Sequence, residues 1–397
     1  MPVVSILARR LGLLAPLRAL VALSGLAALS ACGPVPIAGT APRVDPSAGP
    51  VQVALLVPGG SSDQGRQVLA TSLENAARLA VSDLRGVDID LRIYETAGDP
   101  GRAAQVAQQA ADAGARIILG PVFGDEANAV GATAARSGLS VLSFSNNTAI
   151  AGGNVFILGQ SFDNTAERLL NHAASEGRGQ VMIVAERTTE GEIAEAAIRS
   201  AAARTGASIV ATESYSFSQQ GIVEALPAIA STARSSGAQT LFFTANTAGA
   251  LPILAQLLPD NRISHPQFQF MGLTRWDIPP ATLELRGLQE GWFAMPDPAL
   301  TERFEARYAA AYGSSPHPIA GLAYDGIAAI GALLATGQPD ALSRAALTQG
   351  SGFVGVNGVF RFRPDGTIQR GLAVATIRDN AVVILDSAPR SFAGPGL

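Results

Sequence analysis

Residues 116–147 read RIILGPVFGDEANAVGATAARSGLSVLSFSNN and predict a strand, a helix and a second strand joined by short loops. The apolar run Ile117–Leu119 stops at Gly120–Pro121, which is typical of a strand buried on both faces of a parallel sheet. The Ala-rich segment Gly124–Ser137 has the length of a helix, and Val141–Leu142 begins the next strand. Parallel crossovers of this kind are right-handed, so both loops open at one sheet edge, where open α/β sheets bind ligands.

Polar side chains follow the second of these strands, in the loop Ser143–Asn147. The loop offers hydroxyl and amide groups but no His, Cys or Lys, so it suits holding a small polar molecule without transforming it. Glu186 follows a later buried strand, and it either lines the same cleft or begins a helix. Trp276 follows another strand, and it either closes over a ligand or partner or packs within its own loop. The candidate cleft residues are Gly60, Ser61, Phe123, Gly124, Ser143, Ser145, Asn146, Asn147, Glu186, Thr274 and Trp276.

The alternation of strands and helices extends along most of the chain and predicts an α/β protein with two doubly wound, Rossmann-like lobes. Residues 353–363 and 372–386 contain strand runs separated by turn signals, so the chain should end in antiparallel hairpins on the second lobe. Tyr324–Asp325 is expected to pack its helix on the first lobe and to cap a loop. The predicted division is 51–158 with 295–337 for lobe 1, 159–294 with 338–386 for lobe 2, and 387–397 for a tail.

Length and composition restrict the class of protein. A chain of 397 residues exceeds one typical core, so two lobes are the default. The net charge is -4 and no basic run occurs, so a role in binding nucleic acid has no support. The 28 basic residues are all Arg. The absence of Lys excludes a P-loop lysine, a Schiff-base lysine and the Ser-x-x-Lys motif of penicillin-binding enzymes.

No catalytic residue, metal site or cofactor is predicted. His172, His265 and His317 have no partner at metal-ligand spacing. Residues 350–355, GSGFVG, match the dinucleotide fingerprint by letter, but a helix precedes them and a hairpin follows, so turn glycines explain the match. The chain has no Gly-x-Ser-x-Gly elbow, and nothing identifies a base for the serines at 143 and 145.

The N-terminus has the layout of a secretory signal. Arginines at 9, 10 and 18 precede an apolar segment, and Leu29–Ala31 places small residues before Cys32, the only cysteine. This arrangement resembles a bacterial lipoprotein signal, which implies cleavage before Cys32 and a lipid on its sulfur; a buried thiol or an uncleaved anchor is the alternative. Residues 1–31 would then be the signal and 32–50 a Pro-rich tether. By the same resemblance, Gly33 favours the outer membrane.

Several motifs together resemble the type 1 periplasmic binding fold, whose relatives include the leucine/isoleucine/valine-binding proteins. They are VALLVPGG (53–60), ILGPVFG (118–124), LSFSNN (142–147) and AYDGIAAIGALL (323–334). In amino-acid-binding members, the resemblance implies hydroxyl residues after the third and fourth strands and an acidic residue from the second lobe. This chain keeps Ser143 and Ser145 but has Phe123–Asp125 after the third strand, and Leu273–Arg275 offers no carboxylate.

The predicted lipid anchor and the altered amino-acid site make the chain look like the penicillin-binding protein activators. These are outer-membrane lipoproteins that stimulate peptidoglycan synthases, and larger members carry a helical-repeat domain that this chain replaces with a short tether. The leading expectation is therefore a non-catalytic periplasmic lipoprotein acting as activator or sensor in cell-envelope synthesis. The alternative is the substrate-binding lipoprotein of an ABC importer for amino acids or amides. The expected partner is a peptidoglycan synthase or an ABC permease, with a small polar ligand between the lobes.

Overall fold

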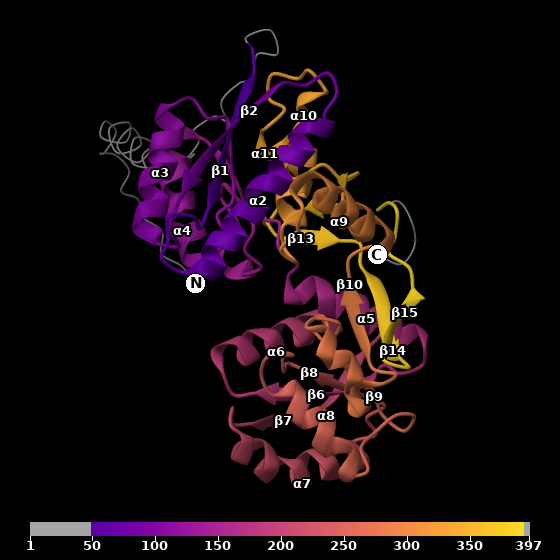
Figure 1. Ribbon diagram of the computed structural model, residues 1–397. Helices are drawn as coiled ribbons and strands as arrows, with labels where there is room; N and C mark the ends of the chain where they lie inside the picture. The colour runs from indigo at the N-terminus through magenta and orange to yellow at the C-terminus, as the bar shows by residue number, and fades with distance from the viewer. Residues whose placement is uncertain (1–48, 393–397) are drawn as a thin grey trace, which may run out of the picture. The chain divides into compact units, whose positions relative to one another are not determined.

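The computed structural model describes residues 49–392 (Figure 1). The predicted signal peptide, Cys32 and nearly all of the tether lie outside these residues. Within them, no helix is long and apolar enough to cross a membrane. The first lobe opens with β1 (Val51–Val57), α2 (Gln64–Asp83), β2 (Ile89–Glu95), α3 (Pro100–Asp112), β3 (Ile117–Leu119), α4 (Gly124–Ala134), β4 (Ser140–Ser143) and β5 (Val155–Ile157). These strands form a parallel sheet in the order β2-β1-β3-β4-β5.

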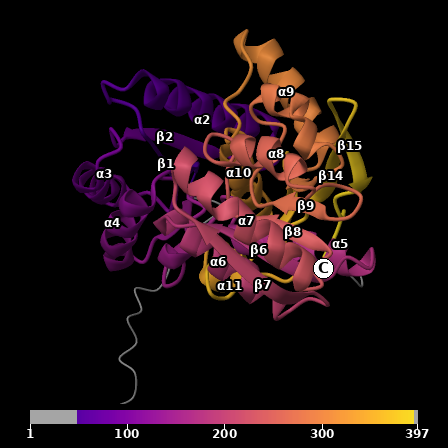
Figure 2. The same ribbon diagram turned by 90° about the horizontal axis from the view of Figure 1, so that it is seen from below.

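Helices cover both faces of this first sheet, as the alternation of β1 side chains requires. Val53 and Leu55 share a core with α2, whereas Ala54 and Leu56 share a different core with α3 and α4. Figure 2 shows α2 on one side of β1 and β2, with α3 and α4 on the other. Asp99 begins α3 by accepting a hydrogen bond from Arg102 N at 2.7 Å, an N-cap that stabilises a helix by about 1 kcal/mol.

The second lobe is built on a mixed sheet in the order β15-β14-β10-β9-β8-β6-β7. Five of its strands are parallel, and β14 and β15 add an antiparallel hairpin at one edge. The predicted α/β fold with C-terminal antiparallel strands is therefore confirmed. The elements are α5 (Phe162–Ser175), β6 (Gln180–Glu186), α6 (Thr189–Ala202), β7 (Ser208–Tyr215), α7 (Gln219–Ser235), β8 (Thr240–Phe243), α8 (Leu251–Asp260), β9 (Gln269–Gly272), β10 (Trp292–Met295), β14 (Ala373–Arg378) and β15 (Ala381–Asp386).

The segment between β10 and β14 returns to the first lobe. It contains α9 (Pro298–Tyr312), α10 (Gly321–Leu334), α11 (Arg344–Leu347), β11 (Phe353–Gly355), β12 (Gly358–Phe362) and β13 (Ile368–Arg370). The three strands form a small antiparallel sheet, and its aromatic residues Phe353, Phe360 and Phe362 pack into the same core as Leu73 of α2. This differs from the predicted division, which gave residues 338–386 to the second lobe. Turn signals predict a hairpin locally but do not predict which core its apolar face will join.

Three connections join the lobes. The chain leaves the first lobe between β5 and α5, returns between β10 and α9, and leaves again between β13 and β14. Ile368 belongs to the core of the first lobe and Leu372 to a core of the second, so the third connection occupies only a few residues. Such short multiple connections confine any movement between the lobes to a few backbone positions.

Candidate functional site

The loops after β3 and β4 bring several of the predicted residues together. A Cβ atom added to Gly124 would lie 3.1 Å from Asn147 Nδ2 and 3.8 Å from Ser145 Oγ. Ser145 Oγ accepts a hydrogen bond from Asn147 N at 3.1 Å, which fixes the turn, and Asn146 and Asn147 are exposed. The carboxyl edge of the first sheet therefore presents amide side chains beside a glycine that leaves room for close approach.

Ser143 has a structural role in these loops. It is fully buried, its hydroxyl donates to Pro121 O at 3.0 Å, and it accepts from Ser145 N at 3.1 Å. The side chain thus ties the β3 loop to the β4 loop, and its only donor is used within the protein. The prediction that Ser143 itself faces a ligand is not supported, because its hydroxyl is fully buried and bonds to backbone atoms of these two loops.

Arg66 adds a positive charge to this edge that the sequence reading missed. Its guanidinium carbon lies 5.3 Å from the centroid of the half-buried Phe123 ring, and Nη1 donates to Ala97 O at 3.0 Å. Gly60 is exposed, and the half-buried Ser61 uses its hydroxyl to accept from Asp63 N at 3.1 Å. The sequence did offer a signal for Arg66. It lies in the first turn of the helix after β1, and that turn lies next to the sheet edge. A cation here favours a ligand with a carboxylate.

Glu126 is buried directly beneath the β3 loop. It is 1 % exposed, and Oε2 accepts from Phe123 N at 3.4 Å, an arrangement that holds the start of α4. Burial raises the pKa of this carboxyl above its ordinary value of 4.5, although the hydrogen bond from Phe123 N and the charge of Arg66 oppose the shift. The second carboxyl oxygen, Oε1, has no hydrogen-bond partner among the described residues. Burial beneath the β3 loop therefore favours the protonated form of this carboxyl more than exposure to water would.

Replacing Glu126 with glutamine should flatten part of the pH dependence of stability. A carboxyl with a raised pKa in the folded protein stabilises it below the unfolded pKa, near 4.5, and that contribution is lost as pH rises through the folded pKa. We expect the free energy of unfolding of the wild type, relative to Glu126→Gln, to fall with pH by at most about 1.4 kcal/mol per pH unit. Denaturant titrations from pH 4 to 8 measure this difference. The exposed Glu302→Gln is the control, and equal pH profiles for all three proteins would contradict the prediction.

The second lobe contributes Glu186 at the end of β6. Its side chain is 9 % exposed, Oε2 accepts from Tyr215 Oη at 3.2 Å, and Oε1 accepts from Thr188 Oγ1 at 3.2 Å. Burial and the neighbouring carboxylate raise the pKa of the Tyr215 hydroxyl, so it stays a donor. Asn246 Oδ1 and Thr274 Oγ1, after β8 and β9, are buried and have no hydrogen-bond partner within residues 49–392. The ends of β8 and β9 therefore retain unused hydrogen-bonding capacity.

Trp276 lies in the core instead of at a cleft mouth. It is fully buried and stacks on Phe293 with 6.3 Å between the ring centroids. Gly272 and Gly291 make room for the indole, since a Cβ atom at either position would come within 3.0 Å of it. Of the two alternatives for this residue, packing within the lobe is the one that the structure shows, and a role in closing over a ligand or a partner is not supported.

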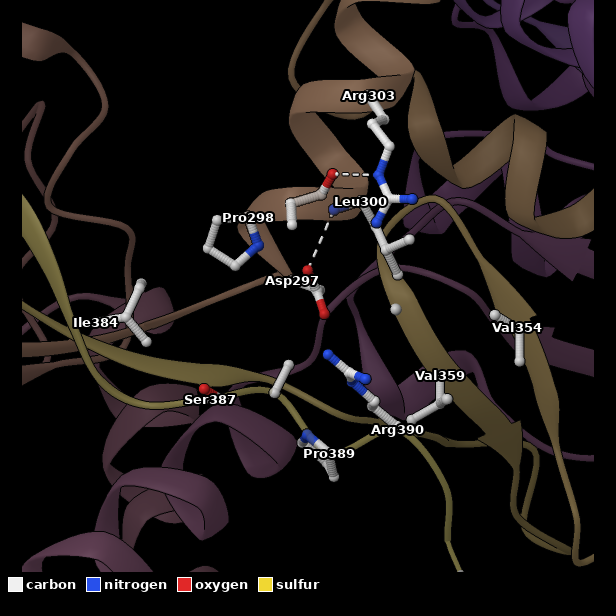
Figure 3. Close-up of a pocket in the computed structure, with 13 residues that line it drawn as sticks. Asp297, Pro298, Leu300, Arg303, Val354, Val359, Ile384, Ser387, Pro389 and Arg390 are labelled. Carbon is white, nitrogen blue, oxygen red and sulfur yellow. Dashed lines mark hydrogen bonds between the residues drawn. The ribbon is translucent and has the colours of Figure 1, made fainter.

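A cavity of about 570 Å³ is lined by residues from the start of α9, the small sheet and the end of the chain (Figure 3). It borders the second connection between the lobes, where Asp297 caps α9 by accepting from Leu300 N at 3.1 Å. Arg303 and Arg390 extend along its walls. None of the predicted cleft residues lines it, so it does not belong to the candidate ligand site.

Neither a metal centre nor a dinucleotide site is evident in the described part of the chain. His172 and His265 line one cavity of about 450 Å³, but no group of three or more possible metal ligands occurs within residues 49–392. The fingerprint-like residues 350–355 lead into β11, so no helix N-terminus follows them. The arrangement of the site can bind a polar solute, and it offers no nucleophile with a base.

Comparison with known proteins agrees with this reading of the fold. A structure of a putative branched-chain amino acid ABC transporter protein from Rhodospirillum rubrum has a TM-score of 0.72 and 17% identity, covering 85% of this chain and 100% of that one. A substrate-binding protein from Desulfitobacterium hafniense in complex with Leu has a TM-score of 0.63 and 18% identity, covering 85% and 100%. A solute-binding protein from Rhodopseudomonas palustris in complex with 3,4-dihydroxybenzoic acid has a TM-score of 0.57 and 16% identity, covering 86% and 98%.

The family comparison covers most of the chain. No curated protein gives a significant match. The family described as periplasmic binding protein matches residues 50–381, which include every described strand before β15 and the three connections. This is a family of binding proteins, as the expectation of a non-catalytic chain requires. The chain therefore belongs to the periplasmic binding protein family.

Proposed function

We propose that this protein is the substrate-binding component of an ABC importer and binds a small organic acid between its lobes. The observation that carries the proposal is the carboxyl edge of the first sheet, where Gly124 and Asn147 lie together and Arg66 covers Phe123. Amide groups and a guanidinium at the edge of an open α/β sheet suit a carboxylate ligand. The sequence analysis gave the importer component as the alternative to an activator of peptidoglycan synthesis. The family match supports the importer component better than the activator.

Glu186 bears on which organic acid binds. The leucine and dihydroxybenzoate bound by the two similar proteins each carry a carboxylate, but only leucine also carries an ammonium group. A carboxylate that is 9 % exposed and already holds two hydroxyl donors suits an ammonium group as its third partner. We therefore infer that the substrate is an amino acid. Glu186 would supply the second-lobe carboxylate for its ammonium group, which Leu273–Arg275 does not offer.

Calorimetric titration of the full-length protein in detergent, with leucine and with benzoate as probes, tests this function. We expect leucine to bind and Glu186→Gln to weaken its binding by at least about tenfold, because a charge-assisted hydrogen bond contributes roughly 1.5–3 kcal/mol. Glu190→Gln is the matched control, since Glu190 is an exposed carboxylate on the first turn of α6. Benzoate binding that is unaffected by Glu186→Gln would retain the receptor function but reassign the substrate class. Failure of both probes and of a wider panel of acids and amides would argue against the receptor.

The lipid anchor at Cys32 remains a proposal supported by the N-terminal sequence, and the outer-membrane location belongs to the activator role alone. The activator role loses one of its supports, because Trp276 is buried and does not offer an aromatic docking residue. Membrane fractionation separates the two functions: an importer receptor works with a permease of the inner membrane, whereas an activator of the resembled kind resides in the outer membrane. Recovery of a peptidoglycan synthase with the outer-membrane protein would favour the activator.

A further inference from the structure

The most deeply buried ion pair in the described chain lies where the lobes are joined. Arg370 Nη1 and Asp325 Oδ2 are 2.6 Å apart, and their side chains are 1 % and 0 % exposed. Arg370 is the last residue of β13, immediately before the third connection, and Asp325 lies within α10 of the first lobe. A charge at this depth is stable only while its partners stay in place.

The backbone of Arg370 is held by the second lobe. Asn164, in the first turn of α5, donates from Nδ2 to Arg370 O at 3.1 Å, and its Oδ1 accepts from Arg370 N. One amide side chain therefore satisfies both polar groups of a single backbone residue. Asn164 is 6 % exposed, so water does not compete for these bonds.

The side chain of Arg370 is held by the first lobe. Its guanidinium lies 4.9 Å from the Phe360 ring centroid. Asp325 is itself fixed, because it accepts from Val356 N at 2.7 Å and from Asn357 Nδ2 at 3.0 Å. These bonds confirm that Asp325 caps a loop, as the sequence predicted. Asp325 thus anchors the guanidinium to the core of the first lobe.

The same guanidinium reaches the first connection and, through it, the candidate ligand site. Arg370 Nη2 donates to Leu158 O at 3.3 Å. The next residue, Gly159, lies directly against the β4 loop, since a Cβ atom there would be 2.7 Å from Phe144 O and 2.6 Å from Ser145 O. A displacement of this connection is therefore transmitted to the backbone that carries Ser145 and Asn147.

We propose that Arg370 is the positioning residue that couples the two lobes, and that the lobes turn about it during ligand binding. Its backbone moves with α5, its side chain is fixed to α10, and its bond to Leu158 joins two of the three connections. A peripheral pair between the lobes, Arg363 with Glu167 at 3.4 Å, is 30 % and 17 % exposed and contributes less. The benefit to ligand binding rests on the proposed receptor function, but the coupling itself does not.

Asn164→Ala tests the coupling, with Asn154→Ala as the matched control. Asn154 also makes two hydrogen bonds to backbone groups, from Nδ2 to Gly131 O and Leu139 O, but all of them lie within the first lobe. Each variant is prepared as the full-length chain with Cys32→Ser and with cysteines at the exposed positions 112 and 224, one on each lobe. Spin labels at these cysteines report the distance distribution between the lobes without any ligand.

We expect Asn164→Ala to broaden the distance distribution and Asn154→Ala to leave it at the width of the parent, although both variants lose two hydrogen bonds. Identical distributions in the two variants would overturn the proposal. If Asn164→Ala does not fold, Arg370→Lys decides by broadening the distribution, because lysine keeps the charge but offers one nitrogen in place of the two that bond Asp325 and Leu158. The distance measurement needs no ligand. If Asn164→Ala keeps the narrow distribution of the parent, the coupling is refuted. Failure to bind leucine or benzoate refutes only the receptor function.

Discussion

Replacing Asp325 with alanine is expected to destabilise the protein by about 3–5 kcal/mol, because it leaves the Arg370 guanidinium buried without a counter-ion. The carboxylate is 0 % exposed and bonds to Arg370 at 2.6 Å, so solvent cannot replace it. The variant also leaves the backbone N–H of Val356 without its acceptor, which adds the cost of an unsatisfied donor. Guanidinium chloride unfolding, followed by circular dichroism, measures the loss as a lower midpoint.

A double variant separates the charge from the packing. Asp325→Leu with Arg370→Met removes both charges and keeps apolar volume, and such replacements of a buried pair are often neutral. We expect the double variant to recover most of the free energy of unfolding that Asp325→Ala loses. It should remain about 1 kcal/mol less stable than the wild type, because the loop cap is missing. If Asp325→Ala unfolds at the wild-type midpoint, or if the double variant is as unstable as the single one, the buried charge does not control stability here.

The fold could be predicted because its signals are local. The apolar run Ile117–Leu119 ends at Gly120, and Asp99 precedes Pro100 as a helix start; each pattern depends only on neighbours within a few residues. The sheet of residues 353–370 was assigned to the wrong lobe because its apolar face has no local preference for either core. Its position depends on contacts with α2 and α10, which are distant in sequence.

The sequence predicted where the loops of the candidate site lie, but not which of their side chains face outward. The Ser143–Asn147 loop does stand at the sheet edge, since parallel strands place their loops there. Which residue of the loop faces outward depends on strand register, and Ser143 points inward whereas Asn147 is exposed. Trp276 is buried because Gly272 and Gly291, which come from the ends of two neighbouring strands, both leave space for it, and the sequence does not show that these two meet at the indole. Arg370 likewise has no sequence signal, because its partners come from four separate segments.

Replacing Gly120 with alanine is expected to cost about 2–4 kcal/mol, the sum of backbone strain and a clash with neighbouring backbone. Gly120 has a φ of +90°, a region that an L-residue adopts only at a cost. A Cβ atom there would lie 2.2 Å from Leu56 O, and the Gly120 N–H donates to Leu142 O at 2.8 Å, so the residue is confined between two strands. Neither backbone can move aside without breaking sheet hydrogen bonds.

Gly153→Ala isolates the strain from the clash. Gly153 has a φ of +55°, but no atom lies within 4 Å of the position that its Cβ would take, so its substitution should cost about 1–2 kcal/mol. Denaturant unfolding of both variants gives the contact contribution as the difference between the two losses. The clash at Gly120 should also displace the loop that carries Phe123 and Gly124, so leucine binding should weaken in Gly120→Ala and not in Gly153→Ala. Equal losses of stability would mean that the β3 loop yields to an added methyl group, and the close approach of Gly120 to β1 would then not determine the shape of the ligand site.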